Sequence, residues 1–198
     1  MKKILNIVGV VAVLLVLFCN GNSEAITIGF NPPTQDVSVG GWALVDLFIS
    51  GLGDYTTPSL SAYDLDVIFD PGKLSLISVS LGDKLNLGIF GSISSITSEI
   101  GSVNLLEISL ESSTDLNNSQ PGSFILATLT FDTLASGISP LELSINGLYD
   151  EGGNSISALI QNGSVSVSVS AVPEPSTFLL LGAGLLVLGL LIRRKIRK

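Results

Sequence analysis

Three aspartates with strand-like spacing are the residues of this sequence that could do chemistry together: Asp64, Asp66 and Asp70. Hard cations such as calcium prefer clustered carboxylate oxygens. In an extended segment Asp64 and Asp66 lie on one face, and Asp70 follows them at a turn. We expect an outward polar face and no resident metal here, with calcium binding as the alternative. The acidic segment 150–154 has the Gly and Asn content of a hairpin turn and is a second alternative metal loop.

The sequence lacks the residues that many enzyme mechanisms need. It contains no histidine, and its single cysteine is Cys19. These facts exclude a histidine-based triad, a cysteine nucleophile after residue 25 and a Cys/His zinc site. A Ser–Lys dyad would need Lys73 or Lys84 to be buried, yet both lysines lie near turn signals. We expect no enzymatic role, and a glycoside hydrolase that uses two of the carboxylates is the distant alternative.

Charge and aromatic content narrow the choice of partner. Residues 26–171 hold two lysines, no arginine and fifteen acidic residues, a net charge of −13. Nucleic acids and anionic lipid surfaces are poor partners for such a body. Four aromatic residues could form a sugar-binding platform: Trp42, Tyr55, Tyr63 and Tyr149. We expect Tyr63 in the core and Trp42 packed at the start of a strand, so carbohydrate binding is an alternative to protein binding.

The elements that position these residues are predicted to be β-strands. Apolar and polar residues alternate with a period of two, which is typical of half-buried strands. The alternating runs are 45–49, 63–69, 77–81, 106–110, 127–131, 141–145 and 165–169. We expect Leu106, Ile108 and Leu110 on a buried face, with Glu107 and Glu111 outward. The Gly- and Ser-rich segment 85–98 gives no assignment.

Turn signals separate the alternating runs. Asp70-Pro71-Gly72 and Asn162-Gly163 are turn-forming sequences of known mechanism. No segment of the body shows a sustained helical period. Strands spaced by about eight to twelve residues predict an all-β protein, an antiparallel β-sandwich of eight or nine strands.

Five blocks of the body, in order, resemble the pattern of cohesin modules. They are residues 36–40, 62–74, 124–131, 137–141 and 162–167. The resemblance covers most of residues 26–170 and implies a nine-stranded jelly-roll sandwich related to bacterial carbohydrate-binding modules. Cohesins of cellulosomes bind calcium-loaded dockerin modules through one sheet face. No partner-binding position is carried over to this sequence.

The N-terminus has the pattern of a secretory signal peptide. A basic start, Met1-Lys2-Lys3, precedes the uncharged apolar run 7–18, and Ser23-Glu24-Ala25 is a small-x-small cleavage site. We expect signal peptidase to cut after Ala25. The alternatives are an uncleaved anchor, which the short run disfavours, and a lipoprotein site at Cys19, which Phe18 disfavours because a small residue is expected before it.

The C-terminus consists of a proline-rich motif, an apolar helix and a basic tail. The motif is Pro173-Glu174-Pro175, the helix is expected at 178–192, and the tail 193–198 begins Arg193-Arg194-Lys195. Fifteen helical residues span about 22 Å, short of the ~30 Å hydrocarbon core, and local thinning can cover the difference. The basic residues act as a stop-transfer signal that keeps this end in the cytoplasm.

This order of blocks resembles the PEP-CTERM sorting signal of Gram-negative bacteria. The resemblance implies processing by an exosortase near Pro173-Glu174-Pro175, and it is associated with exopolysaccharide and biofilm matrix. A plain tail anchor is the alternative. We therefore expect a signal peptide at 1–25, a cohesin-like sandwich at 26–171 and a sorting signal at 172–198.

The expected protein is non-enzymatic and exported. It is held briefly in the inner membrane with its body in the periplasm, and it then reaches the cell surface or the extracellular space. There it would mediate protein–protein contact or structural display through a sheet face. An exopolysaccharide-binding module is the alternative.

Overall fold

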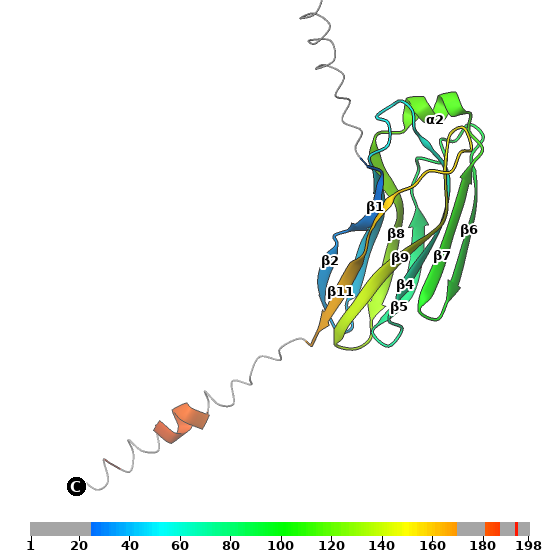
Figure 1. Cartoon of the computed structure of the whole chain (residues 1–198). Coiled ribbons are helices and arrows are strands. Elements are labelled where there is room, and N and C mark those ends of the chain that lie inside the picture. Colours follow the sequence, from blue (N-terminus) through cyan, green and yellow to red (C-terminus); the bar gives the residue numbers. More distant parts are fainter. Residues whose placement is uncertain (1–24, 170–180, 187–192, 194–198) are drawn as a thin grey trace, which may run out of the picture. The chain divides into compact units, whose positions relative to one another are not determined.

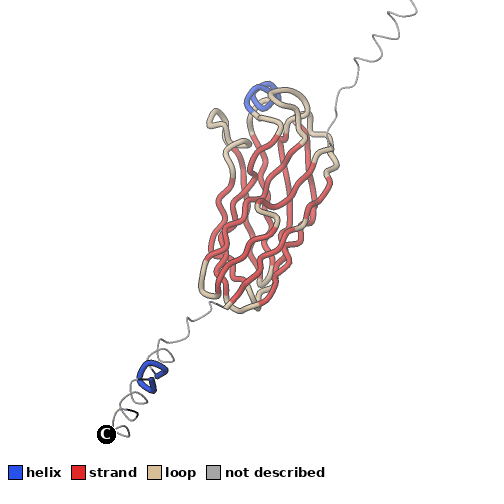
Figure 2. Tube along the Cα trace, turned by 90° about the vertical axis from the view of Figure 1, so that its left-hand side faces the viewer, coloured by secondary structure: helices blue, strands red, loops and turns tan. Residues whose placement is uncertain are grey.

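The computed structural model describes residues 25–169, 181–186 and 193. The body is an elongated β-sandwich with a short helix at one end (Figures 1 and 2). The first part of the chain forms β1 (Thr27–Asn31), β2 (Thr34–Ser38), β3 (Trp42–Ser50), β4 (Leu60–Phe69), β5 (Leu74–Leu81) and β6 (Ser92–Glu99). The second part forms β7 (Ser102–Ser109), α2 (Ser113–Ser119), β8 (Ser123–Thr133), β9 (Gly137–Asp150), β10 (Leu159–Gln161) and β11 (Gly163–Ser168).

Two sheets make up the sandwich. The five-stranded sheet has the order β10-β1-β3-β8-β5, and the six-stranded sheet has the order β2-β11-β9-β4-β7-β6. The first and last strands of the body are each divided between the two sheets. The first is interrupted at Pro32-Pro33 and the last at Asn162, and at each interruption the chain passes from one sheet to the other. β1 pairs with β10, and β2 with β11, in the only parallel pairings of the described body. Counting each split pair as one strand gives the nine strands expected from the sequence.

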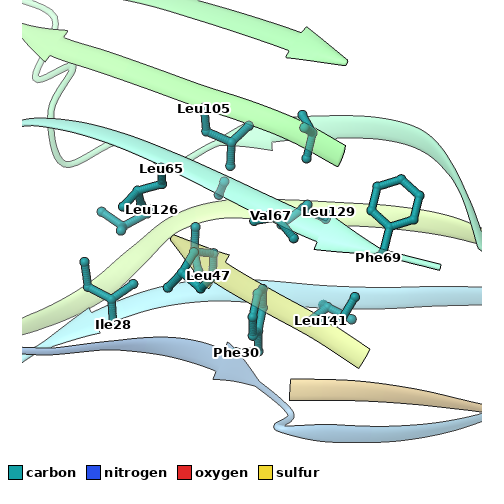
Figure 3. Packing of buried hydrophobic residues seen from close by; sticks show 14 of the residues in the cluster. Ile28, Phe30, Leu47, Leu65, Val67, Phe69, Leu105, Leu126, Leu129 and Leu141 are labelled. Carbon is teal, nitrogen blue, oxygen red and sulfur yellow. The ribbon is translucent and has the colours of Figure 1, made fainter. Parts of the chain in front are cut away.

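The core lies between the sheets and is mostly aliphatic. Figure 3 shows side chains from both sheets interleaved, among them Leu47 and Leu129 from one sheet and Leu65 and Leu105 from the other. Phe69 and Phe131 meet edge to face with ring centroids 5.1 Å apart, a favourable geometry for aromatic pairs. All buried residues of this cluster lie between Ile28 and Val167. The span from Ile26 to Val169 therefore contains every residue that the core needs.

All seven alternating runs fall in strands, as predicted, although Leu110 and Val169 lie just beyond the ends of β7 and β11, and the face was wrong in β7. Val103, Leu105 and Glu107 point inward, whereas Ile108 and Leu110 are exposed. Apolar residues occur on both faces of this strand, so alternation alone could not choose between them. Glu107 is only 2% exposed, and two hydroxyl groups inside the sandwich donate hydrogen bonds to it.

Two further differences concern Glu111 and β5. Glu111, expected outward, is buried and accepts hydrogen bonds from the backbone N–H groups of Ile89, Phe90 and Gly91 at 3.0–3.1 Å. In β5 a register shift between Leu76 and Ser78 makes Ile77 the bulged residue. Ile77 is therefore exposed, although the pattern predicted that it shares the dry face with Val79 and Leu81.

Five elements lie outside the predicted alternating runs: β1, β2, β6, β10 and α2. β6 lies in the unassigned Gly- and Ser-rich segment. α2 begins at a cap in which Ser112 Oγ accepts a hydrogen bond from the Asp115 N–H at 3.2 Å. The Ser112-x-x-Asp115 spacing is the sequence signal that could have located this helix.

The C-terminal unit, residues 169–198, is described separately from the body. Residues 181–186 are helical, within the apolar run expected at 178–192. Among the described residues, no helix is long and apolar enough to cross a membrane. Residues 1–24 of the predicted signal peptide, Pro173-Glu174-Pro175 and Arg194-Lys195 lie outside the described residues.

Candidate functional site

The candidate site is the outer face of four neighbouring strands, β9, β4, β7 and β6, which we call the four-strand face. The strand pairing places its outward side chains in four rows that run across the strands. The apolar row holds Ile93, Ile108, Ala62 and Tyr149; the next row holds Ser95, Leu106, Asp64 and Gly147. The third row holds Thr97, Asn104, Asp66 and Ser144; the last holds Glu99, Ser102, Ile68 and Glu142.

A hydrogen-bonded cluster of two aspartates and two asparagines occupies the centre of this face. Nδ2 of Asn104 donates to Oδ1 of Asp64 at 2.6 Å and to Oδ1 of Asp66 at 2.8 Å. Nδ2 of Asn146 donates to Oδ2 of Asp66 at 2.8 Å and reaches Oδ1 of Asp64 at 3.4 Å. The amide groups thus hold the two carboxylates side by side.

A β-bulge brings Asn146 to this cluster. Asp64 pairs with Gly147 and the next residue, Leu65, pairs with Ile145, so Asn146 is the extra residue of β9. A bulge redirects the side chain that it carries. The sequence gives no signal for this arrangement, because Asn104 is at least 38 residues, and Asn146 at least 80 residues, from the aspartates that they contact.

The apolar row is exposed on three of the four strands and half-buried at Ala62 of β4. Ile93 is 56% exposed, and Ile108 and Tyr149 are each 42% exposed. Isolated exposed apolar side chains are ordinary on protein surfaces, whereas a contiguous group marks an interaction site. The row therefore distinguishes this face from a merely solvated sheet.

The opposite end of the face is hollowed and acidic. A shallow hollow of about 310 Å³ is lined by Asp66, Ile68, Thr97, Glu99, Ser102 and Asn104. The four strands contain no lysine or arginine, so the carboxylates of Asp64, Asp66, Glu99 and Glu142 face solvent without a cation on these strands. Such a surface attracts cationic and hydrogen-donating groups.

The third candidate metal ligand, Asp70, lies apart from this cluster. Its carboxylate pairs with Lys73 and accepts a hydrogen bond from the Gly72 N–H at 2.9 Å. The hydrogen bond from Lys73, followed by the one from Gly72, lowers the pKa of Asp70 below its usual value. Within the described part of the chain, no three His, Cys, Asp or Glu side chains gather in a geometry that could hold a metal ion.

The acidic loop 150–154 is closed by its own hydrogen bonds. Oδ1 of Asp150 accepts from the N–H groups of Gly152 at 2.9 Å and Asn154 at 2.8 Å, and the Asn154 side-chain amide also donates to this carboxylate. These bonds, with that of the Asn154 side chain the largest cause, lower the pKa of Asp150. The hairpin-turn prediction for this loop agrees with this geometry.

The four aromatic residues proposed as a platform do not share a surface. Tyr63 is buried, as predicted. Tyr149 lies on the four-strand face, and Tyr55 lies in the loop between β3 and β4. Trp42 was expected to pack, but it is 73% exposed on the outer face of the five-stranded sheet, directly opposite Asp132 of β8.

Sequence comparison identifies only the C-terminal segment. Residues 171–195 match the family of the PEP-CTERM protein-sorting motif. This range includes Pro173-Glu174-Pro175 and Arg193-Arg194-Lys195, and the motif is that of exported, exosortase-processed proteins. No curated protein matches the sequence.

Structural comparison identifies the fold of the body as that of cohesin domains. The seventh ScaB type I cohesin from Pseudobacteroides cellulosolvens is 19% identical and superposes with a TM-score of 0.60 over 76% of this chain and 96% of its own. A non-cellulosomal cohesin from the archaeon Archaeoglobus fulgidus is 19% identical, with a TM-score of 0.57 over 75% of this chain and 94% of its own. The Coh-OlpA–Doc918 cohesin–dockerin complex from Clostridium thermocellum contains a chain that is 15% identical, with a TM-score of 0.60 over 73% and 100%.

Proposed function

We propose that this chain is an exported, exosortase-processed, non-enzymatic surface protein whose sandwich binds a protein partner through the four-strand face. The observation that carries the proposal is the exposed apolar row beside a hydrogen-bonded carboxylate cluster on the outer face of one sheet. Interfaces of this kind combine an apolar patch with polar groups that fix orientation. The similar cohesin–dockerin complex supports the proposal, because its cohesin chain shares this fold.

The chemistry of the face favours a partner with basic or hydroxyl-bearing side chains. Asp64 and Asp66 each offer carboxylate oxygens to an incoming donor, and the surrounding strands supply no cation. Ile93 and Ile108 offer an apolar surface to the same partner. Such charge complementarity raises the association rate and makes it sensitive to salt.

The test is differential capture of a surface partner from the native host. Three versions of the span 26–169 are immobilised: the wild type, Ile108→Lys and Leu44→Lys. Leu44 is the matched control, because it is exposed on the outer face of the opposite sheet. We expect Ile108→Lys to lose a partner that the wild type and Leu44→Lys both retain at low salt. Equal capture by all three proteins would contradict the proposal.

A second candidate function is binding of exopolysaccharide. The exposed indole of Trp42, with the Asp132 carboxylate directly opposite, is the observation that favours it, since an exposed tryptophan offers an apolar ring face to a sugar. Native affinity electrophoresis in host exopolysaccharide would compare Trp42→Ala with Tyr149→Ala. Retardation that is lost only in Trp42→Ala would support sugar binding, and equal mobility of all proteins with and without polysaccharide would exclude it.

The processing scheme is part of the proposal. Signal peptidase removes residues 1–25, and the exosortase acts near Pro173-Glu174-Pro175 once the helix at 178–192 and the basic tail 193–198 have stopped transfer. The body then resides in the envelope or the biofilm matrix. Intact mass of the protein from the cell-surface and medium fractions is the test. A species from Ile26 to near Pro173–Thr177 is expected, whereas a mass that still includes residues 193–198 would leave the tail as a simple anchor.

A further inference from the structure

The four edge strands of the sandwich differ in how well they are protected from pairing with another chain. β10 and β2 are short, with three and five residues. β5 has eight residues but carries the bulge at Ile77. β6 also has eight residues, and it pairs with β7 over its whole length without any register shift. Short strands and bulges are devices that block edge-to-edge association, so β6 is the open edge of the described body (Figure 1).

The hairpin geometry shows which main-chain groups of β6 face outward from the sheet. Glu99 pairs with Ser102 across a two-residue turn, and the Leu110 N–H donates to the Gly91 carbonyl at 2.9 Å. In an antiparallel ladder the bonded and non-bonded pairs alternate. The odd-numbered residues of β6 therefore bond with β7. The N–H and C=O groups of Ser94, Ile96 and Ser98 point to the free edge.

The side chains of β6 suit pairing with an identical strand. Its first seven residues are uncharged and Glu99 is its single charge; it contains no lysine and no proline, the residues with which edges are commonly guarded. Ile96 is 43% exposed, although its pairing with Leu105 places it on the inner side of the sheet. An added strand would cover this isoleucine.

We infer that β6 pairs with β6 of a second copy of this chain, antiparallel, about a two-fold axis through Ile96. The two Ile96 side chains then face one another, and Ser94 of each copy faces Ser98 of the other. Each Glu99 lies opposite Ile93 of the other copy, so no like charges are directly opposed. The product is one continuous sheet that presents two four-strand faces side by side. A single strand pair buries little surface, so the dimer is weak and depends on the high local concentration of a surface protein.

Analytical ultracentrifugation of the span 26–169 tests this dimer. The wild type should show concentration-dependent dimerisation, and Ile96→Lys should remain a monomer because two ammonium groups would meet on the axis. Ile77→Lys is the matched control, an exposed isoleucine on the bulged edge β5, and it should dimerise like the wild type. Circular dichroism and melting curves verify that both variants are folded. A wild type that stays monomeric up to about 1 mM would overturn the inference.

A cysteine probe tests the register directly. The mature span contains no cysteine, so a single Ile96→Cys substitution places one thiol on the proposed axis, where directly opposed residues are within disulfide reach. Mild oxidation should give a covalent dimer of Ile96→Cys and leave Ile77→Cys monomeric. Equal crosslinking of the two variants, or none in Ile96→Cys, would contradict the pairing. Ile96 is on the inner side of the sheet, so these results are independent of binding at the four-strand face.

Discussion

The hydroxyl group of Tyr63 donates a hydrogen bond to Oε2 of Glu107 across 3.0 Å inside the sandwich. Ser92 Oγ donates to the other carboxylate oxygen at 2.7 Å. These three residues belong to β4, β7 and β6, so one buried carboxylate links three neighbouring strands of the six-stranded sheet. The link reaches β6, the strand whose free edge is proposed to pair with a second copy.

Removal of the Tyr63 hydroxyl should destabilise the body. Tyr63→Phe deprives the buried Glu107 of one donor, and leaving a buried polar group without its partner costs about 1–3 kcal/mol. Urea unfolding of the span 26–169 measures the change. Tyr149→Phe, at an exposed position, is the control and should stay within about 0.5 kcal/mol of the wild type. Equal stability of Tyr63→Phe and the wild type would show that the hydrogen bond contributes nothing.

Stability should also fall at high pH because of the same pair. Burial, and then the charge of Glu107, raise the pKa of Tyr63 above its ordinary value of 10.0. The folded state therefore binds the phenolic proton more tightly than the unfolded state. This contribution is complete below pH 10 and declines as the pH rises above it. Melting temperatures between pH 8 and 11 should decline more steeply for the wild type than for Tyr63→Phe, and parallel curves would refute the effect.

The sequence predicted most strands correctly, because one face of each strand is buried in the core and the apolar residues on that face recur with a period of two. It failed at Ile108 because both faces of β7 are apolar, and the register was decided by the turn at Ile100-Gly101 and by the pairing with β4. It failed at Glu107 for a different reason. A carboxylate is expected outward, and only the three-dimensional fold supplies the hydroxyl groups of Tyr63 and Ser92 that make its burial favourable.

The candidate site was predictable only in part. The pattern placed Asp64 and Asp66 together on an outward face, and the structure agrees. It could not supply Asn104 or Asn146, because strand order and a bulge bring these residues to the cluster. Asp70 was grouped with the other aspartates only because it is near them in the sequence. In the structure it lies at a turn, and its carboxylate pairs with Lys73.

Among the polar residues at the end of the sandwich that carries α2, Gln120 should be the one whose substitution lowers stability most. It is fully buried; its Oε1 accepts from the Leu60 N–H at 2.7 Å, and its Nε2 donates to the carbonyls of Leu60 and Lys84. Gln120→Ala leaves these backbone groups unpaired, so we expect a loss of at least about 2 kcal/mol. Gln35→Ala is the control, because the Gln35 Oε1 atom is buried without a partner. Urea unfolding measures both variants. An equal loss of unfolding free energy in Gln120→Ala and Gln35→Ala would contradict the importance of the Gln120 hydrogen bonds.

Glu111 should order the segment before β6. Its carboxylate accepts hydrogen bonds from the N–H groups of Ile89, Phe90 and Gly91. Charge-assisted hydrogen bonds of this kind are stronger than neutral ones. Glu111→Ala should abolish hydrogen-exchange protection of these three amides while the core strands stay protected. Glu99→Ala, at an exposed carboxylate, should leave them unchanged. Protection that survives in Glu111→Ala would show that the segment is held by other contacts.

The stability of the turn at Asp150 should depend on pH in the acid range, and the side-chain amide of Asn154 should control this dependence. The hydrogen bonds from Asn154, its side chain first, and from Gly152 hold the pKa of Asp150 below its ordinary value of 3.8. The folded carboxyl releases its proton more readily than the unfolded one, so the stabilisation exists above pH 3.8 and is lost as the pH falls further. Carbon-13 NMR titration of the side-chain carboxyl should show a higher pKa in Asn154→Ala than in the wild type. Asn118→Ala, at an exposed position on α2, should leave the pKa unchanged. An identical titration in all three proteins would mean that the Asn154 amide does not hold this carboxylate.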